Sequence, residues 1–251
     1  MTFPITVSIG SINTTLHPIM ESAAFLIGGR YFWYLKRKQG DVIEEQQRIW
    51  ILIGAIFGAL VGSRLIGSLE NPSELFSATN VWLYVYNNKT VLGGFLGGLI
   101  GVEMVKKIIK EKRSSGDLMT YPIILALMIG RLGCFSMGVY DGTSGTPTTF
   151  FTGMDLGDGI MRHPVALYEI FFLLLLWIFL VRLEKKVVLA EGSRFKIFLI
   201  AYMLYRFSVD FIKPSEHIIF GLSTIQLTSI AGLIYYYRSI LQPKKLLLQN
   251  A

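Results

Sequence analysis

The chain has 251 residues, 52% of them hydrophobic, and a mean hydropathy of +0.51, which together exclude an ordinary soluble domain. Its formal net charge of +7 is compatible with nucleic acid or a membrane surface as a partner. Its one cysteine, Cys134, excludes an intramolecular disulfide.

Seven apolar runs follow one another along the chain, and most approach the length of a membrane-spanning helix. We therefore predict an all-α, polytopic membrane protein of about seven transmembrane helices, folded as a single transmembrane domain over residues 1–251. The predicted runs are Ile19–Leu35, Ile49–Leu69, Val91–Val105, Leu118–Ile129, Val165–Val181, Phe195–Ile212 and Ile225–Ile240.

Lys and Arg residues are distributed unevenly between the connections. Of the 24, 17 lie in alternate connections, within residues 36–48, 106–113, 182–196 and 238–245, whereas 4 lie in the connections between these. Because cytoplasmic connections carry the excess of Lys and Arg, we predict an external N-terminus and a cytoplasmic C-terminus. The basic charge therefore indicates topology in a lipid bilayer, and we predict no nucleic-acid partner.

Polar residues stand near the predicted outer ends of the first two spans. His17 precedes the first run and lies four residues before Glu21, so the two share one helix face. Arg64 stands near the end of the second run, which places it close to the outer surface. These residues are either polar groups at the membrane interface or part of a functional site.

The third run opens with five glycines in nine residues, from Gly93 to Gly101, which is poor helix composition in water. In a membrane, small residues allow helices to approach each other closely. Gly97 and Gly98 therefore serve helix packing or form the floor of a lipid groove, and the sequence leaves both interpretations open.

The stretch Gly130–Gly142 places Arg131 at the end of the fourth run and follows it with three more glycines. An arginine at membrane depth costs about 2.5 kcal/mol or more, so it is rarely retained without a function. Glycines let a ligand approach the backbone closely. The stretch indicates an anion site at the membrane surface or, alternatively, a tight turn with one arginine that reaches the interface.

An external connection of about residues 130–164 joins the fourth and fifth spans, and its length is typical of a functional segment. It ends with Arg162 and His163, and the fifth span then carries Tyr168 and Glu169.

The sixth run carries Tyr202, Arg206 and Asp210 at i, i+4 and i+8, on one face of one helix. Charged residues within a span need partners and usually line a cavity, so we predict a functional face.

Under the predicted topology, these polar residues lie in the outer half of the membrane or just above it. Arginines, carboxylates, a histidine and tyrosines at one depth suit binding of a phospholipid phosphate combined with proton transfer. The sequence shows no metal-ligand spacing, no P-loop and no Gly-x-Ser-x-Gly motif, so we predict neither a metal site nor a cofactor.

Several motifs resemble those of the bacterial prolipoprotein diacylglyceryl transferase family, in the same order and over nearly the whole chain. They are Gly62-Ser63-Arg64-Leu65, Gly97-Gly98-Leu99-Ile100-Gly101-Val102, Gly130-Arg131-Leu132-Gly133-x-Phe135, Arg162-His163-Pro164-x-x-Leu167-Tyr168-Glu169, Tyr202-x-x-x-Arg206-Phe207-x-x-Asp210-Phe211 and Ser223-x-x-Gln226-x-x-Ser229.

The resemblance implies a seven-span enzyme of the bacterial cytoplasmic (inner) membrane whose active site faces the outer leaflet. Such an enzyme transfers the diacylglyceryl group of phosphatidylglycerol to the lipobox cysteine thiol of prolipoproteins, whose signal peptides it binds, and glycerol phosphate leaves. Carried over by position, Arg131 and Arg206 hold the phosphate, Tyr202 and Asp210 shape the same pocket, and Arg64 lines it. With His163 added as a candidate base, the predicted catalytic residues are Arg131, Arg206, His163, Tyr202 and Asp210. The predicted substrate-binding residues are Arg64, Gly97, Gly98, Gly133, Gly142, Arg162, Tyr168 and Glu169 of these segments, together with His17, which lies outside the family motifs.

The chain departs from the family pattern at four positions. Cys134 and Met137 replace asparagines, Val139 replaces a glutamate, and Leu96 replaces the usual histidine of the third span. The identity of the general base is therefore open: His17 or His163 could substitute, or the arginines could favour the thiolate of the acceptor. The alternative function is a non-catalytic lipid-binding or lipid-transport paralogue on the same scaffold, and a third is an intramembrane structural subunit.

Overall fold

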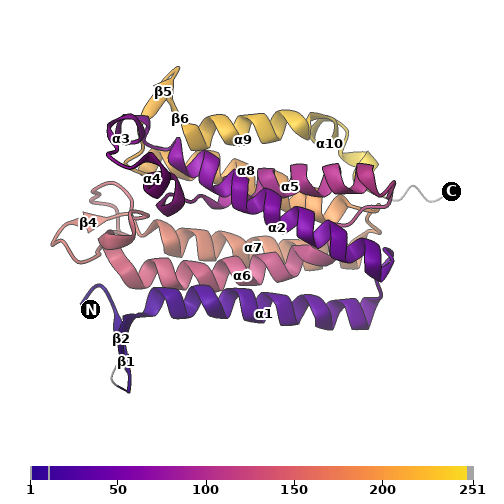
Figure 1. Ribbon diagram of the computed structural model, residues 1–251, viewed down its shortest axis with the longest axis horizontal. Helices are drawn as coiled ribbons and strands as arrows, with labels where there is room; N and C mark the ends of the chain where they lie inside the picture. Colours follow the sequence, from indigo (N-terminus) through magenta and orange to yellow (C-terminus); the bar gives the residue numbers. More distant parts are fainter. Residues whose placement is uncertain (1, 11, 248–251) are drawn as a thin grey trace. The chain divides into compact units, whose positions relative to one another are not determined.

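The computed structural model describes residues 2–10 and 12–247 and divides into two compact units built mainly from helices (Figure 1). The chain passes repeatedly from one unit to the other, so each unit combines segments that are distant in sequence. Unit 1 comprises Met1–Gly40, Gly116–Leu189 and Phe211–Pro214, and unit 2 comprises Asp41–Ser115, Ala190–Asp210 and Ser215–Ala251. The predicted single domain over residues 1–251 stays a prediction.

Unit 1 is built from three long helices, α1 (Leu16–Gln39), α6 (Asp117–Met137) and α7 (Val165–Lys186). Helix α6 packs against both α1 and α7 (Figure 1). An antiparallel hairpin of β1 (Thr6–Ile9) and β2 (Ile12–Thr15) leads directly into α1.

Two glycines set the distance between α1 and α6. A Cβ atom at Gly28 would lie 3.0 Å from the Cβ atom of Ala126, so only a hydrogen fits there without a shift. A Cβ atom at Gly133 would lie 3.0 Å from Met20 Cβ and 3.2 Å from the backbone oxygen of His17. Because Gly133 has no side chain, the first turn of α1, with His17, lies close against the C-terminal part of α6.

The connection from α6 to α7 is compact rather than structureless. It begins with the 3₁₀ helix η1 (Gly138–Asp141) and contains a small antiparallel pair of β3 (Met154–Asp155) and β4 (Met161–Arg162). Backbone hydrogen bonds also join Gly145 to His163 over 2.9 Å, which ties the connection to the start of α7.

In unit 2, α2 (Glu45–Ser68) and α5 (Val91–Ile108) pack along their lengths through glycines (Figure 1). A Cβ atom at Gly58 would lie less than 3.0 Å from the backbone oxygen of Gly97. A Cβ atom at Gly62 would likewise lie less than 3.0 Å from the backbone oxygen of Gly93. The two backbones therefore touch directly, as small residues permit inside a membrane.

The rest of unit 2 is centred on α8 (Ser193–Val209), which packs against α9 (Thr224–Tyr235). Ser223 and Gln226 form a reciprocal capping box that begins α9. The remaining short elements of the chain are α3 (Pro72–Ser77), α4 (Val81–Asn87), η2 (Asp210–Ile212), β5 (His217–Ile219), β6 (Leu222–Ser223), α10 (Tyr237–Leu241) and η3 (Pro243–Leu246).

Large apolar side chains on the helices remain exposed, as expected for surfaces that face lipid. Phe25 of α1, Ile56 of α2 and Phe171 of α7 are 75%, 69% and 63% exposed. By length and composition, α2, α7 and the segment Asp117–Asp141 can each cross a membrane. The chain is therefore an α-helical membrane protein, whereas the seven spans and their orientation stay predictions.

Each predicted apolar run is helical, but three boundaries were wrong. Helix α6 continues through the glycine-rich stretch to Met137, so Arg131 lies inside a helix, and the connection predicted to begin at residue 130 begins at Gly138, with η1. The sixth run gives way to a 3₁₀ turn at Asp210, and the seventh is interrupted at Tyr236. In the glycine-rich stretch of α6, helix propensities measured in water favour a turn, whereas packing against α1 favours the helix.

Candidate active site

Arg131 is held in unit 1 by a buried ion pair between two helices. Its Nε atom lies 2.9 Å from Oε1 of Glu169 on α7, and the two side chains are 10% and 1% exposed. Loss of either partner would remove the ion-pair partner of a buried charge, which is costly. Glu169, predicted to bind substrate, therefore fixes the position of the Arg131 guanidinium.

His17, Cys134 and Asp141 come together beside this ion pair. His17 Nδ1 lies 3.3 Å from Asp141 Oδ1, and one donor atom of each of the three residues lies within 4.8 Å of the others. Arg131 Nη1 donates to Cys134 Sγ over 3.6 Å, which links the group to the ion pair. We call His17, Cys134 and Asp141 the donor cluster.

Sequence reasoning did not identify this cluster. His17 lies in the first turn of α1, far along the chain from Cys134, so no spacing rule connects the two residues. Asp141 stands next to Gly142 and is typical of a turn. The only available signal was the cysteine at a position where the family pattern has asparagine.

His163 and Tyr168 form a second polar contact in unit 1. His163 Nδ1 lies 3.1 Å from the Tyr168 hydroxyl, which also forms a hydrogen bond with the Thr152 hydroxyl. Arg162 instead donates from Nε to Asp158 Oδ2 over 2.8 Å, in an ion pair that is partly exposed. The predicted arginine and histidine are therefore neighbours in sequence with different environments.

The α6–α7 connection turns at residues with restricted backbone conformations. Gly142 ends η1 with a φ of +67°, a region that favours glycine, so its conformation alone accounts for its presence. Backbone amides of Gly157 and Gly159 donate to Asp155 and hold the pKa of that carboxyl below its usual range.

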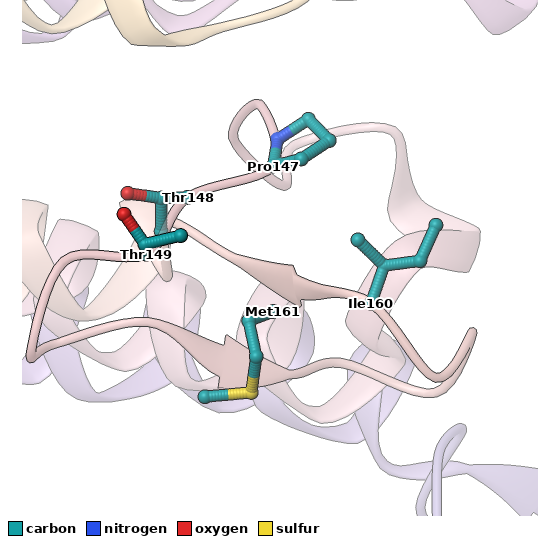
Figure 2. Close-up of a pocket in the computed structure, with 5 residues that line it drawn as sticks. All are labelled: Pro147, Thr148, Thr149, Ile160 and Met161. Atoms are coloured by element: carbon teal, nitrogen blue, oxygen red, sulfur yellow. The ribbon is translucent and has the colours of Figure 1, made fainter.

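The same connection carries an open groove of about 490 Å³ (Figure 2). None of the predicted site residues lines it, and its lining has no charged group. The lining residues are Pro147, Thr148, Thr149, Ile160 and Met161.

In unit 2, the predicted polar face of the sixth run is buried; it spans α8 and the first residue of η2, Asp210. Tyr202, Arg206 and Asp210 are 0%, 4% and 0% exposed, and the Tyr202 ring meets Phe95 of α5 edge to face at 5.1 Å. The Asp210 carboxylate accepts hydrogen bonds from Ser223 and, over 3.4 Å, from Ser215. Polar groups on a buried face of an apolar helix are typical of a functional position.

The remaining predicted residues of unit 2 lie on α2 and α5. The Arg64 guanidinium lies over the Tyr86 ring, 5.5 Å from its centroid. Gly97 contacts the backbone of α2, which agrees with a role in helix packing. A Cβ atom at Gly98 would have its nearest neighbour at 3.4 Å, an ordinary van der Waals distance. Leu96 approaches Gly232 of α9, so the position where the family has histidine is an apolar helix contact here.

A family model described as prolipoprotein diacylglyceryl transferase matches residues 4–240. The chain belongs to this family. Several relatives are named phosphatidylglycerol–prolipoprotein diacylglyceryl transferase. The chain is 26% identical to that of Nitratidesulfovibrio vulgaris strain DP4, covering 85% of this chain and 82% of the relative. It is 28% identical to that of Wolbachia pipientis, covering 90% and 89%, and 29% identical to that of Rickettsia felis, covering 92% and 93%.

Membership of the prolipoprotein diacylglyceryl transferase family confirms the resemblance seen in the motifs. Two differences from the family pattern therefore matter for the site. Leu96 stands where the family has a histidine, and Cys134 places a thiol beside Arg131. The site roles of the individual residues stay predictions.

Proposed function

We propose that this chain transfers the diacylglyceryl group of phosphatidylglycerol to the lipobox cysteine of prolipoproteins, the first step of lipoprotein maturation. The observation that carries the proposal is the family match over residues 4–240, which includes the Gly-Arg-Leu-Gly motif. Support from the structure comes from Arg131 of that motif, which is buried and oriented by Glu169.

Arg131 is the proposed phosphate ligand in unit 1. A guanidinium carries five N–H donors, so it can bind a carboxylate and a phosphate at the same time. As the glyceryl carbon–oxygen bond breaks, negative charge grows on the departing glycerol phosphate, and the fixed guanidinium stabilises that charge. Arg206 of unit 2 is proposed to be a second arginine required for phosphate binding, with Tyr202 and Asp210 shaping its surroundings.

The decisive experiment measures transfer to a synthetic lipobox peptide by mass spectrometry, with the purified chain in nanodiscs that contain phosphatidylglycerol. We expect the peptide to gain one diacylglyceryl group, and phosphatidylethanolamine nanodiscs to give none. Binding of phosphatidylglycerol without transfer would contradict the proposal and favour the non-catalytic alternative.

The arginine assignments are tested by Arg131→Lys and Arg206→Lys. Lysine keeps the positive charge but loses the planar fork, so we expect each variant to lower transfer at least about tenfold, or about 1.4 kcal/mol of transition-state stabilisation. Arg238→Lys, at an exposed arginine of α10 that belongs to none of the family motifs, is the matched control and should retain wild-type transfer. Near wild-type transfer by either test variant would remove that arginine from the proposal.

We also propose seven spans in a bacterial inner membrane, with an external N-terminus and an active site that faces the outer leaflet. The charge distribution of the connections supports this topology. Reporter fusions should place residue 110 and the C-terminus in the cytoplasm, and residue 150 outside. A cytoplasmic residue 150 would put the α6–α7 connection on the wrong side for a prolipoprotein substrate.

A further inference from the structure

The donor cluster of His17, Cys134 and Asp141 combines one imidazole, one thiol and one carboxylate from three separate elements. Each is a donor type that zinc binds in proteins. Zinc–ligand bonds of about 2.0–2.3 Å in a tetrahedron place ligand atoms about 3.5 Å apart. The His17–Asp141 distance of 3.3 Å already matches this, and the full set lies within 4.8 Å, so the other ligand pairs have to close by at most about 1.3 Å.

We infer that the donor cluster is a zinc site with three protein ligands, in which the fourth position takes the acceptor thiol of the peptide substrate. Three protein ligands with one open position is the arrangement of catalytic rather than structural zinc. The side chains of His17 and Asp141 are 22% and 12% exposed, so the protein does not cover the cluster completely.

The surroundings balance the charges of such a site. A thiolate at Cys134 and a carboxylate at Asp141 neutralise Zn²⁺, and His17 binds as the neutral ring. The charge of Arg131 is compensated by Glu169 at 2.9 Å, while its Nη1 atom donates to Cys134 Sγ. Hydrogen bonds of this kind orient a metal ligand.

Zinc also supplies what the chain lacks for the proposed function, on which this part of the inference rests. A coordinated thiol loses its proton outright, so no histidine at position 96 is needed. The proton passes to solvent, and the thiolate sulfur attacks the glyceryl carbon that carries the phosphate ester. The carbon–sulfur bond forms while the carbon–oxygen bond breaks, and its electron pair leaves on glycerol phosphate beside Arg131.

The metal site is tested without any measurement of transfer, by titrating the purified full chain with Cd²⁺ and Co²⁺. Cys134 is the only cysteine, so a thiolate-to-metal charge-transfer band reports on this position alone. We expect saturation at one metal per chain, and zinc should protect Cys134 from a maleimide. Cys134→Ser should abolish the band, and His17→Ala and Asp141→Asn should each weaken binding at least about tenfold.

The matched control is His217→Ala, which removes an exposed histidine of unit 2 and should leave the titration unchanged. Absence of the band in the wild-type chain would overturn the site. So would equal affinity in His17→Ala and Asp141→Asn, because the thiol would then bind metal alone. Maleimide labelling of the wild-type, His17→Ala and Asp141→Asn chains in native membranes, without added metal, shows whether each has folded around Cys134. Cys134→Ser has no thiol to label, so its folding is checked by thermal unfolding.

The fourth ligand is tested by adding a lipobox peptide to the cobalt form. Its cysteine should intensify the charge-transfer band, and a serine peptide should not. An unchanged spectrum would overturn the thiol-binding role. Full transfer by chelator-treated chain containing less than about 0.1 metal per chain would overturn zinc activation while leaving the proposed transferase intact, whereas binding without transfer would contradict only the transferase.

Discussion

The α1–α6 contact of unit 1 and the α2–α5 contact of unit 2 both depend on glycine, but they use it differently. Along α2 and α5, glycine faces glycine and backbone meets backbone, as at Gly58 and Gly97. On α6, Gly133 instead makes room for the first turn of α1, which carries His17. Glycine-rich helices thus serve close packing in one unit and placement of a polar side chain in the other.

The largest loss of stability is expected when the Arg131–Glu169 ion pair of unit 1 is broken. Glu169→Ala would leave the Arg131 guanidinium buried without its carboxylate, which should destabilise the protein by about 3–5 kcal/mol. Thermal unfolding of the purified protein measures this loss. Asp158→Asn, in the exposed ion pair with Arg162, is the control and should cost less than about 1 kcal/mol. Equal losses of stability would contradict the expectation that burial makes the Arg131–Glu169 pair more important than the Arg162–Asp158 pair.

A smaller loss is expected where the glycine contact of unit 2 is widened. Gly58→Ala places a methyl group against the Gly97 backbone oxygen, which cannot rotate away, so we expect a cost of about 1–3 kcal/mol. Gly94→Ala is matched in chemistry, but its nearest neighbours lie 3.8 Å away. It should therefore accumulate and unfold like wild type. Similar behaviour of the two variants would contradict the close backbone contact.

The smallest effect on stability, but not on transfer, is expected at Gly133. In Gly133→Ala the added methyl group meets Met20 Cβ at 3.0 Å, so α1 must shift by a few tenths of an ångström. We expect an unfolding temperature close to that of wild type and a loss of transfer of at least about tenfold, because small displacements of functional groups lower rates. Unchanged transfer would show that the position of His17 does not matter for the reaction.

The pattern of apolar runs located the seven longest helices of the described residues, because lipid requires every backbone polar group to be satisfied within its own helix. It misjudged Gly130 to Met137, because helix propensity measured in water does not include contact with α1. It also found Arg131 and Glu169 separately, whereas their pairing depends on how α6 and α7 align.

The donor cluster lay beyond sequence reasoning for a different reason. Metal motifs are recognised by short spacings, and His17 joins Cys134 and Asp141 only through helix packing. For Gly97, the sequence left packing and lipid binding open, and the contact with Gly58 supplies a packing role. Whether Gly98 also meets lipid stays a prediction.

The interleaving of the two units has a consequence for biosynthesis. Unit 1 takes its final segment from Phe211–Pro214, and unit 2 begins at Asp41. Neither unit is complete when the first half of the chain has left the ribosome, so neither unit can finish folding before later segments are made. Helix α1 must wait in the membrane for α6, which is made later, and a chain that ends before Phe211 lacks part of both units.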